Sequence, residues 1–207
     1  MTSRLLLLTC GVCSILAFAM NARAGDQAKA DVTAFRAYLE KQQPAKRWQS
    51  GPTVLDGDEI RKAYGKRRFC FVFSSPPLPP GANLPELIEA YRQRSVEFQK
   101  NFTSLSVAFD EKDAIAPLTK PQDYNVGLMK VQTDEQARIA GAAILSLHGS
   151  DRVGPGVVAA KEVMVTKSAK GWNCTVQRQN AFIGTVVFDA GGTCTSIAKS
   201  YAGPVPP

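Results

Sequence analysis

The sequence has few of the side chains that most often carry out enzymatic chemistry. His148 is the one histidine among 207 residues, and its place just before Gly149 fits a cation at a helix C-terminus. There is no Gly-x-Ser-x-Gly motif and no phosphate-binding Gly-x-x-x-x-Gly-Lys-[Ser/Thr] motif. Paired carboxylates of a glycan hydrolase are the enzymatic alternative, but Glu86, Glu89 and Glu97 fit capping or surface roles. We therefore expect a protein that is not an enzyme and has no cofactor.

The amino end is typical of a bacterial export signal. It has a positive start at Arg4, an apolar run over 5–20 and a small-x-small cleavage site ending at Ala24. The apolar run is shorter than the roughly 20 residues that span a bilayer, although a short membrane anchor is the alternative. The sequence predicts a signal peptide over 1–24, cleaved after Ala24. The predicted location is periplasmic or secreted, with no transmembrane segment after cleavage.

Cysteine is also scarce. Three cysteines follow the predicted signal, namely Cys70, Cys174 and Cys194, and they lack the close pairs of a structural metal site. An oxidising compartment favours one disulfide and one remaining thiol. We predict a disulfide between Cys174 and Cys194, which would stabilise the fold by roughly 3 kcal/mol. Cys70 lies in an apolar run and is explained as a small buried side chain. A bond from Cys70 to either of the others is the alternative.

Positive charge exceeds negative charge, with 25 Lys and Arg residues against 18 Asp and Glu residues. Part of it is concentrated over 61–68, where five cations occur with no acidic residue between them: Arg61, Lys62, Lys66, Arg67 and Arg68. This basic cluster is the candidate anion-binding surface. The alternative is a solvated helix end that leads into a strand.

Hydrophobic periodicity predicts an α+β fold. An N-terminal helical segment is expected over 25–67, with one helix ended by Pro44 and a second over 56–64. The continuous apolar run over 69–74 predicts a strand that is buried on both sides. The expected elements that follow are a helix over 83–101, a strand from Thr103, a strand over 124–131, and a helix capped by Thr133 and ended by Gly149.

The remaining sequence predicts a β-meander. Its expected strands cover 157–166, 172–177, 182–188 and 193–197, with glycine or polar turns between them. We expect an antiparallel sheet that ends in this meander, with helices on one face. The element order from Phe69 matches a ferredoxin-like (split βαβ) core. The α+β domain is expected over 68–200, followed by a disordered proline-rich tail over 201–207.

The spacing from Trp172-x-Cys174 to Cys194 resembles the carboxy-terminal disulfide loop of type IV pilins. The chain differs from pilins at its amino end, where a cleavable signal replaces the long retained apolar helix with its early glutamate. The resemblance therefore implies no pilin function for this chain.

Together these features predict a non-enzymatic binding or accessory protein of the bacterial cell envelope. We expect a protein partner, engaged as an inhibitor or immunity-type protein or within a secretion or surface assembly. The alternative is an anion-binding module that uses the basic cluster to bind lipopolysaccharide or another anionic lipid head group, an anionic glycan or nucleic acid. Nucleic acid is disfavoured, because only Tyr64 and Phe69 lie near enough for base stacking.

Overall fold

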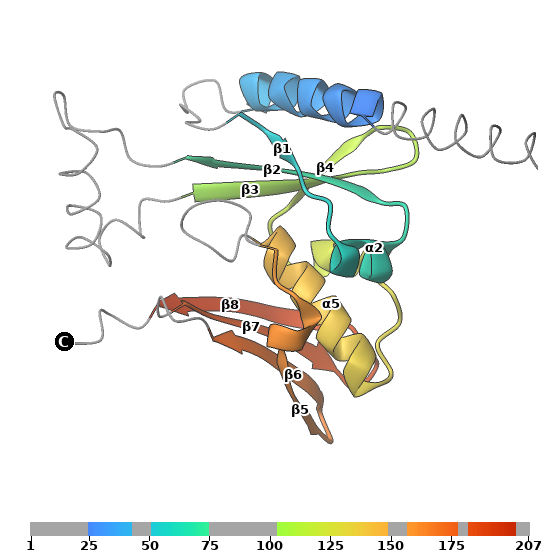
Figure 1. Ribbon diagram of the computed structural model, residues 1–207, viewed down its shortest axis with the longest axis vertical. Helices are drawn as coiled ribbons and strands as arrows, with labels where there is room; N and C mark the ends of the chain where they lie inside the picture. The colour runs from blue at the N-terminus through green and yellow to red at the C-terminus, as the bar shows by residue number, and fades with distance from the viewer. Residues whose placement is uncertain (1–24, 43–50, 75–102, 149–156, 178–181, 202–207) are drawn as a thin grey trace, which may run out of the picture.

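A computed structural model describes five ranges of the chain (Figure 1): 25–42, 51–74, 103–148, 157–177 and 182–201. Within these ranges the chain forms two antiparallel four-stranded sheets and three α-helices. The expected α+β class is therefore confirmed. The predicted signal peptide, the helix over 83–101 and the tail beyond Tyr201 lie outside the described residues.

The first sheet has the strand order β1-β2-β3-β4, each strand antiparallel to its neighbours. The strands are β1 (Thr53–Val54), β2 (Arg68–Ser74), β3 (Thr103–Phe109) and β4 (Ile115–Leu118). The strand predicted to be buried on both sides is confirmed in β2. Phe69 and Phe71 belong to the larger hydrophobic core, whereas Cys70 and Val72 belong to a second cluster. Because side chains alternate along a strand, β2 contributes to two apolar layers.

The N-terminal helix (25–42) covers the outer face of the first sheet (Figure 1). Phe35 and Leu39, two of the residues whose spacing predicted this helix, are buried against Cys70, Val72 and Val107. The helix thus closes the second hydrophobic cluster. The first sheet consequently has helical cover on both faces.

The second sheet is the predicted meander, with the strand order β5-β6-β7-β8. Its strands are β5 (Met164–Ser168), β6 (Gly171–Gln177), β7 (Phe182–Asp189) and β8 (Cys194–Tyr201). The first strand begins later than predicted, after the 3-10 helix η2 (Ala160–Glu162). The segment before it packs on helix α5 instead, because Val158 is buried and its amide donates to Ser146 Oγ at 2.8 Å.

Helix α5 (Asp134–Leu147) lies between the two sheets (Figure 1). The predicted capping box is confirmed: the amide of Gln136 donates to Thr133 Oγ1, and the Gln136 side chain accepts from the amide of Thr133. The sequence predicted one apolar face, but every residue over 140–147 is buried. A helix enclosed by sheets on both sides needs apolar or small residues around its whole circumference.

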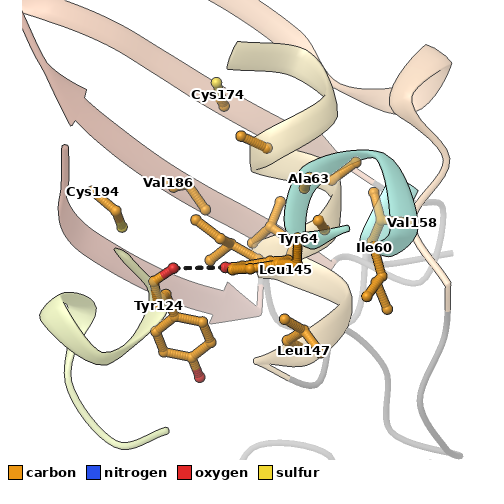
Figure 2. Close-up of a cluster of buried hydrophobic side chains, with 14 of the residues drawn as sticks. Ile60, Ala63, Tyr64, Tyr124, Leu145, Leu147, Val158, Cys174, Val186 and Cys194 are labelled. Carbon is orange, nitrogen blue, oxygen red and sulfur yellow. Dashed lines mark hydrogen bonds between the residues drawn. The ribbon is translucent and has the colours of Figure 1, made fainter. Parts of the chain in front are cut away.

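Helix α2 (Asp58–Tyr64) packs beside α5 and is anchored there by polar contacts. The Tyr64 hydroxyl donates to the carbonyl of Tyr124 at 2.8 Å, a contact that Figure 2 shows at the centre of the core. The amide of Met129 donates to the carbonyl of Ala63 at 2.7 Å. The end of α2 is therefore fixed relative to α5.

The ferredoxin-like core is not confirmed, because the strand that follows α5 joins a second sheet. The prediction of a strand over 124–131 is wrong. The chain there forms the 3-10 helix η1 (Pro121–Asn125) and then an irregular segment. Asp123 Oδ2 accepts hydrogen bonds from the amides of Thr119 and Lys120, which favours a helical turn. Gly127 then adopts a positive φ of 74°, which interrupts an extended strand.

Gly141 allows α5 to approach β6 closely, since an added Cβ would lie 2.8 Å from Cys174 Cβ. We predict that Gly141→Ala destabilises the fold by about 1–2 kcal/mol, because overpacking outweighs the gain in helix propensity. Thermal or denaturant unfolding measures the change. Gly51→Ala is the control, because an added Cβ there would have only Arg36 Nη2 within reach, at 3.9 Å. Unchanged stability of Gly141→Ala would contradict the close packing.

Candidate functional site

A cavity of about 380 Å³ lies between the N-terminal helix, β1, α2 and the start of β2. Its wall includes the buried side chains of Leu55, Ile60 and Phe69. Four members of the predicted basic cluster line the same cavity, namely Arg61, Lys66, Arg67 and Arg68. We call this site the basic cavity. The fifth cation, Lys62, does not belong to its lining.

The connection between α2 and β2 brings these cations together. Helix α2 ends at Tyr64 and is capped by Gly65, which adopts a positive φ of 62°. The Gly65 amide donates to the carbonyl of Arg61 at 2.9 Å. Glycine tolerates this conformation because it lacks a Cβ. The chain then enters β2 at Arg68, so Lys66 and Arg67 lie in a short turn beside the cavity. Local backbone geometry therefore converts a run in the sequence into part of a cavity wall.

Arg68 is neutralised by carboxylates from distant parts of the chain. Its guanidinium lies 2.5 Å from Asp31 Oδ1 on the N-terminal helix and also donates to Asp113. The Asp31 side chain is only 5% exposed, so this ion pair is largely shielded from water. Arg68 also stacks over the Phe109 ring, 5.3 Å from its centroid. Its role is thus to fix the N-terminal helix to the first sheet.

Arg61 is neutralised locally. Its guanidinium nitrogens lie 2.6 Å from Asp56 Oδ1 and 2.5 Å from Asp58 Oδ1. The hydrogen bond to Asp58 and the charge of Asp56 raise the pKa of Arg61. The two carboxylates together therefore more than balance the single positive charge of Arg61.

Lys66 and Arg67 have no carboxylate partner within ion-pair distance in the described part of the chain. Arg67 donates to the carbonyl of Val126 and lies 5.7 Å from the Phe69 ring centroid. Desolvation lowers the pKa of Arg67, which shows that its charge is held partly away from water. Lys66 is exposed. Of the four cations in the lining, Lys66 and Arg67 are therefore the two without a described ion-pair partner.

The predicted disulfide is not formed, because all three described cysteines are free and buried. Cys174 lies on β6 and Cys194 on β8, and β7 runs between them with Val186 opposite Cys174 (Figure 2). Two interstrand spacings alone separate them by at least roughly 9.6 Å, beyond the ~7 Å between Cα atoms that a disulfide permits. Cys70 lies in the other hydrophobic cluster and is unpaired as well. Burial raises the pKa of each thiol to about 12.

His148 is not a cation at a helix end, as its position in the sequence had suggested. Burial and the nearby Lys199 ammonium lower its pKa to about 4, so it is neutral at physiological pH. Its Nδ1 lies 2.9 Å from the Tyr124 hydroxyl, and its carbonyl accepts from Lys199 Nζ. His148 is partly buried, joins α5, η1 and β8 beside the core, and does not line the basic cavity.

Sequence reasoning missed Asp31, the carboxylate that closes one side of the basic cavity. Asp31 accepts from Gln27 Nε2 at 3.0 Å in addition to pairing with Arg68. A signal was present, because Asp31 precedes the buried Phe35 by four residues and so shares its helix face. An acidic residue on an inward face indicates a buried partner.

Comparison of the chain with protein-family models, curated proteins and solved structures finds no match. Within the five described ranges, no group of three or more His, Cys, Asp or Glu side chains is placed to hold a metal ion. Among the helices described here, none is long and apolar enough to cross a bilayer. The function of the basic cavity must therefore be argued from its own geometry.

Acid should destabilise the wild-type protein more than a His148→Gln variant. The folded-state pKa of about 4 lies below the ordinary value of 6.5, so the unfolded chain binds an extra proton between these values. Stability is therefore lost as the pH falls from 6.5 towards 4, by up to about 3 kcal/mol. Urea unfolding of both proteins across this pH window measures the difference. Parallel stability curves would contradict a buried, neutral His148.

Proposed function

We propose that the protein is an exported, non-enzymatic binding protein of the bacterial envelope that holds an anionic ligand in the basic cavity. One observation carries the proposal: Lys66 and Arg67 line the same cavity as an apolar wall. Neither cation has a carboxylate partner among the described residues. Ligand sites are typically ~300–1,000 Å³, mostly apolar, and contain a few placed polar groups. The basic cavity has this composition and lies within this range of size.

Binding without chemical transformation is favoured by the state of the titratable groups. The two carboxylates in the lining, Asp31 and Asp56, are already engaged in ion pairs with arginines. The imidazole of His148 is hydrogen-bonded to the Tyr124 hydroxyl, away from the cavity lining. The remaining charged groups of the cavity are cations suited to attracting an anion. Export remains a prediction from the segment 1–24.

We place anion binding ahead of the protein partner predicted from the sequence. The proline-rich run over 76–81, a segment that could contact such a partner, lies outside the described residues. The basic cavity, by contrast, combines a concave shape with two cations, Lys66 and Arg67, that have no described ion-pair partner. A concave site with unpaired cations limits the ligand to a class of anions, whereas an open sheet edge accepts many protein partners.

The proposal predicts that anion binding depends on Lys66 and not on Lys62. Calorimetric titration of the protein with a panel of anions, from acetate and phosphate to alkyl carboxylates, should reveal binding by at least one of them. Lys66→Glu should weaken that binding by about tenfold or more, because it replaces an attractive charge with a repulsive one. Lys62→Glu is the matched control, because Lys62 carries the same charge outside the lining. Binding of no anion, or equal weakening by both variants, would contradict the proposal.

A further inference from the structure

We infer that the ligand is a small amphiphile with one anionic head group on an apolar body of about ten carbons. This inference rests on the proposed function and narrows it. It sets aside lipopolysaccharide, anionic glycans and nucleic acid as ligands of this site. Three properties of the basic cavity carry it: its volume, the continuity of its apolar wall with its cations, and the carboxylates around it.

The volume limits the ligand. A space of about 380 Å³ holds about a dozen water-sized groups at ~30 Å³ each. An alkyl carboxylate of ten carbons has a comparable number of non-hydrogen atoms. A polymeric anion would be confined to the opening, where it could not use the apolar wall. A compact ligand uses both parts of the site.

The apolar wall is continuous with the free cations. Leu55, Ile60 and Phe69 are buried side chains of this wall. The Arg67 guanidinium lies over the Phe69 ring, so the change from apolar to cationic surface occurs over one side-chain contact. A guanidinium has five N–H donors, and the described contacts of Arg67 use one of them on the Val126 carbonyl. The others are available to a carboxylate or phosphate head group beside Lys66.

Carboxylates around the cations oppose an extended anion. Asp56 and Asp58 are paired with Arg61, and Asp31 and Asp113 are paired with Arg68. Asp58 and Asp113 are about 70% exposed, at 73% and 70% respectively, so their charge faces solvent. A polyanion that extends beyond Lys66 towards either arginine meets these carboxylates and is repelled. A single head group at Lys66 and Arg67 avoids them.

A chain-length series tests this inference on the full protein. Acetate, hexanoate, decanoate and tetradecanoate, each below its micelle concentration, are titrated by calorimetry at constant ionic strength. We expect one-to-one binding whose affinity rises up to about fourfold per methylene, the equivalent of ~0.8 kcal/mol, and levels off near ten carbons when the cavity is filled. Octyl glucoside, which has no charge, should bind more weakly than decanoate. Lys66→Glu should weaken decanoate but leave octyl glucoside unchanged, and Lys62→Glu should change neither.

The outcomes separate this inference from the proposed function. Lys66-dependent binding of phosphate or heparin with no effect of chain length would overturn the inference and leave the proposed function intact. Binding of none of these probes would overturn both. Equal binding of decanoate to wild type and Lys66→Glu would place it on another apolar surface and also overturn the inference.

A membrane lipid has the same chemistry as a free amphiphile, so vesicles of phosphatidylglycerol provide a further arm. We expect no Lys66-dependent co-sedimentation, because the cavity holds a whole small ligand. If the protein co-sedimented with the vesicles in a Lys66-dependent way but did not bind free decanoate, the inference of a free amphiphile as ligand would be contradicted.

Discussion

The enclosure of α5 between two sheets is the constraint on which the rest of the structure depends. The inner faces of both sheets belong to one hydrophobic core that contains this helix, so the helix must be apolar or small all round. Gly141 lacks the Cβ that would collide with Cys174. Helix α2 gains its fixed position from α5 and from the hydrogen bond between Tyr64 and Tyr124. The turn at Gly65 is then directed towards the first sheet. Central packing thus positions a surface turn.

The basic cavity shows how the same residue type serves two purposes. Arg68 holds the N-terminal helix on the first sheet through the buried Asp31, and without that contact the cavity would lack one wall. Lys66 and Arg67, which follow one another in the turn, have no such structural partner among the carboxylates described. Structural cations close the site, and the remaining cations give it a charge that attracts an anion.

Much of the fold could be predicted from local pattern. The apolar run of β2, the capping box at Thr133 and the meander are each encoded in a few adjacent residues. Local pattern could not show which sheet a strand joins. For this reason one sheet was expected where there are two, and the predicted bond between Cys174 and Cys194 was wrong. The basic cluster was visible for the same local reason. The sequence did not show which of these cations lack an ion-pair partner, because such partners can be distant in the chain. Those of Arg68, for example, lie 37 and 45 residues away.

The most direct test of this account locates the ligand itself. Isotope-filtered nuclear Overhauser spectra of the protein with bound decanoate report which protons lie within about 5 Å of the alkyl chain. The account predicts contacts from chain methylenes to Leu55, Ile60 and Phe69, with the carboxylate end nearest Lys66. Contacts to other surfaces only, at a concentration that saturates binding, would contradict it.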